Sequence, residues 1–373
     1  MKFNIQSKLL FTHLQAVSKV VNSKNTISIL DNFLFNLTGD TLVITASDQE
    51  TTLTTQVEVT NAEGKGKFAV GVKEILDMLK ELPDQGLSVD INDQNLAINI
   101  TYMNGEFNFI GINGNEFPVK AQPEGDVSTL ILPAQKVARG IQQTVFAVGT
   151  ESLRPMMMGI YWDIKPEEIA FVSTDTHKLV RFRELGLATG LERSFILPTK
   201  PATILASILD KQEGDVKITI DSKSATFESA EYSMSCRFVN GRYPNYNSVI
   251  PQDNQYTLTI DRLTMLAAIK RVSVTASPGG LVKFDLKENQ IHLSTQDIDY
   301  SKSSEEVVSC DYTGAEMLIG FNDDNIIDVL NNIGNDMVTV ELMDPSRAGI
   351  FKPAEQRENE DLLVLLMPMM VMV

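Results

Sequence analysis

His177 is one of only three histidines in the chain, and Asp175 lies two residues before it. Such a pair could act as a general acid and base, but no nucleophile motif accompanies it. The sequence has no P-loop, G-x-S-x-G or H-E-x-x-H motif and no cysteine–histidine cluster with metal-ligand spacing. Asp297 and Asp299 could begin a cation loop, but the glycine and the distal glutamate of a calcium loop are missing. The sequence predicts no enzyme, no metal site and no cofactor.

Three predicted helices carry lysine and arginine, although the formal net charge of the chain is −17. They span Ser7 to Lys24, Ala134 to Val148 and Asp261 to Thr275. The first two contain no carboxylate, and the only acid of the third, Asp261, occupies an N-cap position. At 100° per residue, the cations within a helix project to one side. Basic faces in an acidic chain favour contact with a phosphate backbone. Ordinary solvated helix surfaces are the alternative.

The elements that would position these cations recur along the chain. An apolar strand leading into an amphipathic helix begins at Phe68, Phe195 and Leu318, which lie 127 and then 123 residues apart. Two further markers recur in the same order and with nearly the same period. One is a strand that ends in an aspartate, and the other is a turn that precedes a proline. This period is far longer than a solenoid unit, so each copy can bury its own core. The sequence predicts three similar domains, at residues 1–126, 127–253 and 254–373.

Each copy contains two helical patterns and many short alternating strands. Asn32–Leu37 and Thr41–Thr45 alternate as a hairpin does, and Val216–Ile220 with Ala225–Ser229 repeats the pattern in the second copy. Asn104-Gly105 predicts a type I′ turn between two further strands. Two helices per copy, packed on antiparallel sheets, give an α+β fold class, three times in tandem.

Composition limits where such a protein works. A hydrophobic content of 43% supports ordinary cores. Cys236 and Cys310 fall in different copies, which favours free thiols and a reducing compartment. The N-terminus has no apolar signal segment, and the longest apolar run, 362–373, is broken by Pro368 and too short to span a bilayer. We therefore expect a cytoplasmic protein without a membrane partner.

Four phrases carry a resemblance to a known family: Thr174 to Leu179, Gly241 to Tyr246, Gly314 to Asn322, and Met367-Pro-Met369. As an ordered set, they make the whole chain resemble the beta subunit of bacterial DNA polymerase III, the replication sliding clamp. The resemblance implies a non-enzymatic processivity factor, a head-to-tail homodimeric ring around duplex DNA of any sequence. It also implies that short peptide motifs of the replicative polymerase and the clamp loader bind a groove between the second and third domains.

The resemblance assigns residues to each role. The peptide-binding groove comprises Met157, Thr174, Thr176, His177, Lys178, Leu179, Pro244, Ser248, Val249, Asn322, Met367, Pro368 and Met369. The DNA-facing set combines family positions with cations of the basic helices: Lys24, Lys73, Lys136, Arg139, Lys200, Lys270 and Arg271. Phe107 and Val272 match family positions at the dimer interface.

The chain also departs from the family pattern. Thr176 replaces a usual glycine, Lys178 an arginine, Met157 a leucine and Ser248 a common basic residue. The tail from Met370 to the C-terminus is longer and more apolar than is typical.

One alternative belongs to a different class of protein. The chain could be an acidic three-domain scaffold or ligand-binding protein that never contacts nucleic acid. Retention on circular DNA that is lost when the circle is cut would separate the two hypotheses.

Overall fold

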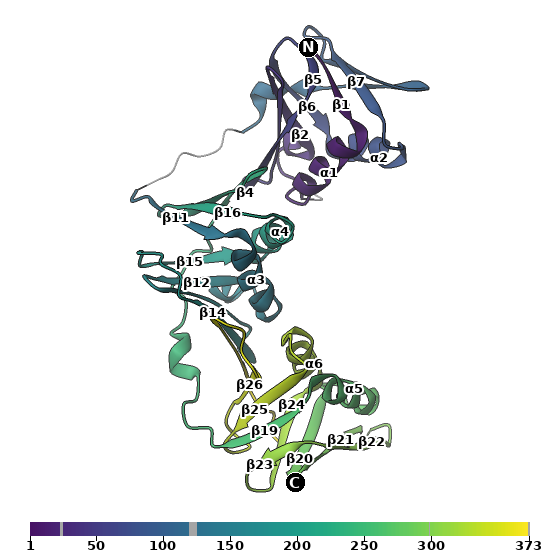
Figure 1. Cartoon of the computed structure of the whole chain (residues 1–373). Helices are drawn as coiled ribbons and strands as arrows, with labels where there is room; N and C mark the ends of the chain where they lie inside the picture. The colour runs from purple at the N-terminus through teal and green to yellow at the C-terminus, as the bar shows by residue number, and fades with distance from the viewer. Residues whose placement is uncertain (23–24, 119–124, 298, 372–373) are drawn as a thin grey trace. The chain divides into compact units, whose positions relative to one another are not determined.

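The computed structural model describes residues 1–22, 25–118, 125–297 and 299–371 (Figure 1). The chain forms two compact units. The first unit is Met1–Ala138 with Thr203–Phe238, and the second unit is Arg139–Ala202 with Val239–Val373. Each unit contains two antiparallel sheets, so the middle copy of the repeat contributes strands to both units.

The first unit contains a five-stranded and a nine-stranded sheet. The five-stranded sheet runs, in spatial order, β5 (Thr60–Glu63), β1 (Lys2–Gln6), β7 (Gly86–Ile91), β8 (Ala97–Tyr102) and β9 (Gly105–Ile110). The nine-stranded sheet runs β10 (Ile112–Asn113), β6 (Gly66–Gly71), β2 (Asn32–Thr38), β3 (Thr41–Ser47), β4 (Thr51–Glu58), β18 (Tyr232–Arg237), β17 (Ser224–Glu228), β16 (Asp215–Ile220) and β11 (Ser128–Pro133).

The second unit contains a nine-stranded and a four-stranded sheet. The nine-stranded sheet runs β15 (Arg193–Pro198), β12 (Gly159–Lys165), β13 (Glu168–Thr174), β14 (Lys178–Leu185), β27 (Glu360–Leu366), β26 (Gly349–Pro353), β25 (Met337–Leu342), β19 (Tyr256–Asp261) and β23 (Asp311–Thr313). The four-stranded sheet runs β22 (Lys302–Ser309), β21 (Gln290–Asp297), β20 (Leu281–Lys287) and β24 (Met317–Asn322).

The described residues form six α-helices, two for each copy of the repeat. They are α1 (Ser7–Ser18), α2 (Val72–Glu81), α3 (Ala134–Thr144), α4 (Thr199–Leu209), α5 (Arg262–Val272) and α6 (Asp323–Asn332). Short 3-10 helices are η1 (Ser28–Asp31), η2 (Gly114–Glu116), η3 (Val145–Ala147), η4 (Pro155–Met157), η5 (Tyr246–Val249) and η6 (Ser273–Thr275). α1 packs against α2, and α5 packs against α6 (Figure 1).

Local sequence explains these elements. In β3, buried Leu42, Ile44 and Ala46 alternate with half-buried residues, because successive side chains of a strand point to opposite faces. α5 begins after Asp261, whose side chain accepts the Thr264 backbone N–H at 2.7 Å. The predicted N-cap is therefore confirmed.

Two strand pairings join one copy of the repeat to the next. In the first unit, β4 pairs with β18, and Leu53 lies opposite Met234. In the second unit, β14 pairs with β27, and Val180 lies opposite Val364. The 127-residue offset carries β4 onto β14 and Leu53 onto Val180. The two internal junctions therefore have equivalent strands in the same antiparallel register.

The predicted α+β class, with two helices per copy on antiparallel sheets, is confirmed. Cys236 and Cys310 are free thiols, as predicted. The boundaries after residues 126 and 253 stay predictions. In the part of the chain that the structure describes, no helix is long and apolar enough to cross a membrane.

Candidate functional site

The turn between β13 and β14 holds several residues of the predicted groove. The Thr174 hydroxyl donates to the Lys178 carbonyl at 2.8 Å, and Asp175 Oδ1 accepts the backbone N–H groups of His177 and Lys178. The turn forces Thr176 to a φ of +82°, a conformation that suits glycine and strains a β-branched residue. His177 and Thr176 are exposed at the tip.

Lys178 is buried in the second unit, with only 6% of the residue exposed. Its Nζ atom lies 2.8 Å from Asp175 Oδ2 and 3.5 Å from Asp328 Oδ2. The same ammonium donates to Asn325 Oδ1 at 2.9 Å. Lys178 therefore ties the turn to α6, and its charge is compensated within the protein.

Leu179 belongs to an apolar cluster on the nine-stranded sheet of the second unit. The cluster includes buried Tyr243, Tyr246 and Ile250, with Met156 half-buried against it. The Tyr246 hydroxyl donates to Asp163 Oδ2 at 2.7 Å, and burial raises the pKa of this phenol above its ordinary value. Pro244 is a predicted groove residue, whereas Tyr243 and Tyr246 were not predicted, although they flank this proline in the sequence.

The C-terminal residues lie beside this turn and the edge of the four-stranded sheet. The backbone N–H of Met367 donates to the His177 carbonyl at 2.8 Å, and that of Met369 donates to the Gly320 carbonyl. Pro368 lies between them and has no N–H to pair. Met367 is 44% exposed and Met370 is 92% exposed. The structure therefore brings Met367 and Met369 to the predicted site.

The remaining groove residues come from three segments of the second unit. A Cβ placed on Gly149 would lie 3.3 Å from Met157 Cβ and 3.4 Å from the Thr174 carbonyl oxygen, so Met157 and Thr174 are neighbours. Ser248 is exposed, and Val249 is 56% exposed beside the buried cluster. Asn322 caps α6 by accepting the Asn325 backbone N–H at 3.0 Å.

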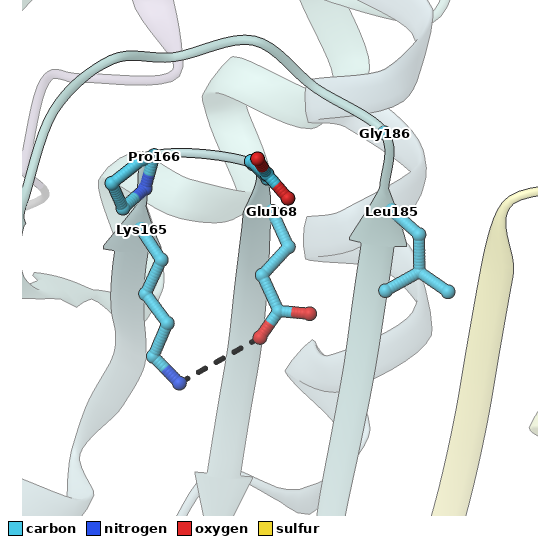
Figure 2. Close-up of a pocket in the computed structure, with 6 residues that line it drawn as sticks. Lys165, Pro166, Glu168, Leu185 and Gly186 are labelled. Atoms are coloured by element: carbon cyan, nitrogen blue, oxygen red, sulfur yellow. Dashed lines mark ion pairs between the residues drawn. The ribbon is translucent and has the colours of Figure 1, made fainter.

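A separate pocket lies at the other end of β13 and β14. Figure 2 shows Lys165, Glu168 and Leu185 around it, and Lys165 Nζ lies 3.6 Å from Glu168 Oε1. Because this pocket is at the far end of both strands from Thr174 and Lys178, it is not part of the predicted groove.

Arg139 and Arg271, both in the predicted DNA-facing set, are paired with carboxylates of the protein. The Arg139 guanidinium donates two hydrogen bonds to the Glu360 carboxylate and lies 5.8 Å from the Phe182 ring centroid. Arg271 donates to Glu306 in the same bidentate manner. These contacts weigh against Arg139 and Arg271 as the main phosphate ligands.

The other predicted cations differ in exposure. Lys73 and Lys270 are exposed, whereas Lys136 and Lys200 are half-buried. Lys24 lies outside the described residues.

Phe107 and Val272 differ as interface candidates. Phe107 is half-buried on β9 and stacks on Tyr102 with ring centroids 5.3 Å apart. Val272 is 1% exposed, so the structure does not support its predicted role as an interface anchor. Helix α5 turns this side chain inward. Val274 is 81% exposed and is the apolar side chain that this segment presents to solvent.

Comparison with known proteins decides the family. Models for the N-terminal, central and C-terminal domains of the DNA polymerase III beta subunit match residues 1–121, 131–245 and 247–370. The chain belongs to this family. The predicted resemblance and the three tandem domains are therefore confirmed.

Individual relatives match along their whole length. The beta sliding clamp of Staphylococcus aureus is 27% identical over 378 residues, which cover 99% of each chain. That of Pseudomonas putida is 26% identical over 374 residues, covering 99% of this chain and 100% of the relative. A solved sliding clamp of Pseudomonas aeruginosa, bound to griselimycin, shares the fold with a TM-score of 0.94, at 24% identity and 100% coverage of both chains.

Proposed function

We propose that this chain forms a head-to-tail homodimeric ring that encircles duplex DNA and acts as a processivity factor of replication. The observation that supports the ring is that two strands at the edges of their sheets, β9 and β22, are equivalent to strands that pair at the internal junctions. The 127-residue offset carries β9 onto β18, which is paired with β4. β22 follows β14 by 124 residues, and β14 is paired with β27. Within a single chain, β9 and β22 end their sheets.

Pairing β9 of one subunit with β22 of the other repeats the internal junctions. Both internal junctions form nine-stranded sheets, and the free sheets have five and four strands. A third junction of the same kind therefore gives a third nine-stranded sheet. Two such junctions close a dimer and leave neither edge open to aggregation.

Encirclement removes the need for tight DNA contacts. A chain with a net charge of −17 gains little affinity from general attraction to phosphate. Lys73 and Lys270 are exposed cations suited to loose contact with a DNA backbone of any sequence. Half-buried Lys136 and Lys200 also belong to the proposed DNA-facing set.

The proposed partner site surrounds Leu179. Exposed Val249 and Met367 supply apolar surface beside the buried cluster that contains Tyr243. Methionine adapts to varied side chains, which suits short peptide motifs of polymerase and clamp-loader subunits. Thr176, His177 and Pro244 would border the bound peptide. We propose a tethering role in the cytoplasm without catalysis.

Replacing Phe107 by aspartate tests the ring. Phe107 is the counterpart of Met234, which is 1% exposed at an internal junction. An unpaired charge buried there should shift the dimer to monomers, at a cost of roughly 3 kcal/mol or more per junction. Sedimentation velocity measures this shift.

Met103→Asp is the control for this experiment, because Met103 is 81% exposed and precedes β9. A dimer that survives Phe107→Asp as well as it survives Met103→Asp would place the interface elsewhere.

A further inference from the structure

Both internal junctions share one register, which a subunit junction of the same kind would repeat residue by residue. Leu53 lies opposite Met234, and Val180 lies opposite Val364. The strand offsets map Met234 to Phe107.

Equivalent hydrogen bonds map Val180 to Ser304. Ser173, which faces Val180, donates from its hydroxyl to the Thr144 carbonyl. Thr295, which faces Ser304, donates in the same way to the Val272 carbonyl at 2.6 Å. In a subunit junction of the same register, Phe107 of one subunit would lie opposite Ser304 of the second subunit.

The neighbouring pair in this register joins two acids. Ser233 lies opposite Thr54 at the first internal junction, and the same offsets map this pair to Glu106 and Glu305. Directly opposed residues of antiparallel strands project to the same face with Cβ atoms about 5 Å apart. We propose that Glu106 of each subunit faces Glu305 of the other and that this like-charge pair weakens ring closure. This inference rests on the proposed dimeric ring.

Exposure along the two strands supports this placement. In β9, half-buried Phe107 and Phe109 alternate with exposed Glu106. In β22, half-buried Ser304 alternates with exposed Glu305. The two carboxylates therefore share the outer face of the junction, and the aromatic rings point to the inner face, where Val274 is exposed.

The groups around the two carboxylates compensate them only in part. Glu106 accepts an N–H of Asn99 at 2.9 Å, which is a neutral partner. His292 Nε2 lies 3.3 Å from Glu305 Oε2, but imidazole carries a charge only when protonated. Lys283 lines the same surface pocket as Glu305, two strands away, and Lys302 lies at the start of β22. Among the described residues, neither Lys283 nor Lys302 forms an ion pair with Glu305, whose side chain is 78% exposed.

A charge-swap cycle in the full-length chain tests the pair. Glu106→Lys places a lysine opposite Glu305, and Glu305→Lys places one opposite Glu106. Each single variant should dimerise more tightly, by about threefold per junction and about tenfold for the two-junction ring. The double variant sets lysine against lysine, so its dissociation constant should return towards that of the wild type. Fluorescence-detected sedimentation over a dilution series measures these constants.

Glu63→Lys is the matched control, because Glu63 is exposed on β5 at the opposite edge of the same sheet and changes net charge equally. Raising salt should tighten the wild-type dimer relative to Glu106→Lys, since screening weakens the repulsion. If Glu106→Lys dimerises no more tightly than Glu63→Lys, or if the double variant shows additive effects, the pair is refuted while the ring stands. A wild-type chain that remains monomeric at every concentration refutes both the ring and the pair.

Discussion

The backbone N–H of Met369 donates a 2.8 Å hydrogen bond to the carbonyl oxygen of Gly320 on β24. A Cβ on Gly320 would lie 2.8 Å from Val371 Cγ2 and 2.6 Å from Leu281 Cδ1. The absence of a side chain at residue 320 therefore lets the C-terminal segment lie on the edge of the four-stranded sheet. Backbone hydrogen bonds at Met367 and Met369 hold this segment, whereas Met370 is 92% exposed.

Deleting Met367 to Val373 should abolish binding of polymerase-type peptides. The deletion removes exposed apolar surface beside Leu179 but leaves β9 and β22 intact, so the dimer should persist. Titration with a fluorescent clamp-binding peptide measures the affinity, and sedimentation checks the dimer. Met370→Ser is the control and should bind as the wild type does. Equal affinity of the truncated and full-length chains would mean that the tail is not part of the groove.

Replacing Thr176 by glycine should stabilise the second unit by about 0.5–1 kcal/mol. Relief of strain at a φ of +82° outweighs the greater freedom of glycine in the unfolded chain. Chemical unfolding monitored through Trp162, the single tryptophan, reports on this unit. Asn289→Gly, at a φ of +59°, is the control and should gain less, because asparagine tolerates this region. A lower free energy of unfolding for Thr176→Gly than for the wild type would show that the backbone of Thr176 is not strained.

Replacing Lys178 by methionine should destabilise the second unit by roughly 1–3 kcal/mol. The change leaves Asp175 and Asp328 without their shared ammonium and unties the turn from α6. Trp162 fluorescence during urea unfolding again gives the free energy. Lys287→Met is the control in the same unit, because its ion pair with Asp285 is largely accessible to solvent and should contribute less than about 1 kcal/mol. If the two substitutions had equal effects, the buried contacts of Lys178 with the turn and α6 would not stabilise the unit more than an exposed ion pair does.

His13 should make the first internal junction sensitive to acid. It is 6% exposed, Nδ1 lies 2.7 Å from Thr55 Oγ1, and the ring stacks on Tyr232. Burial lowers the His13 pKa from its ordinary 6.5, and the nearby Glu231 carboxylate opposes this only in part. The unfolded chain therefore binds a proton at a higher pH than the folded chain. The His13 contribution is complete above about pH 6.5 and is lost as the pH falls through the lowered pKa.

Thermal unfolding of the full chain between about pH 7.5 and pH 5 tests this dependence. His13→Gln should flatten the decline relative to the wild type. His177→Gln, at an exposed position, should leave the decline unchanged. An identical decline in all three proteins would exclude His13 as the responsible group.

The features that could be predicted from the sequence are those that recur along the chain or depend on neighbouring residues. The Asp261 cap and the three strand-to-helix units follow from short-range chemistry. The predicted type I′ turn at Asn104-Gly105 is wrong, because Tyr102 pairs with Gly105 and neither Met103 nor Asn104 has a positive φ. Here the strand register, set by the whole sheet, moves the turn by one residue.

Contacts between residues far apart in the chain could not be predicted from the sequence. Arg139 and Glu360 are 221 residues apart, so the pairing of Arg139 within the protein could not be read from its helix. The match of Val272 to a family position likewise carried no information on its burial, and Val272 is 1% exposed whereas Val274 is 81% exposed. In both cases the packed structure determines which neighbour covers the side chain.

Retention on DNA tests the central claim of topological binding most directly. The full-length protein is loaded by a clamp loader and ATP onto a nicked circular plasmid, and the bound fraction is measured by gel filtration before and after a single restriction cut. The protein should remain on the circle in high salt and leave after linearisation, because encirclement does not depend on phosphate contacts. Retention on the linear product, or tight binding to a short duplex of one particular sequence, would contradict a sliding ring.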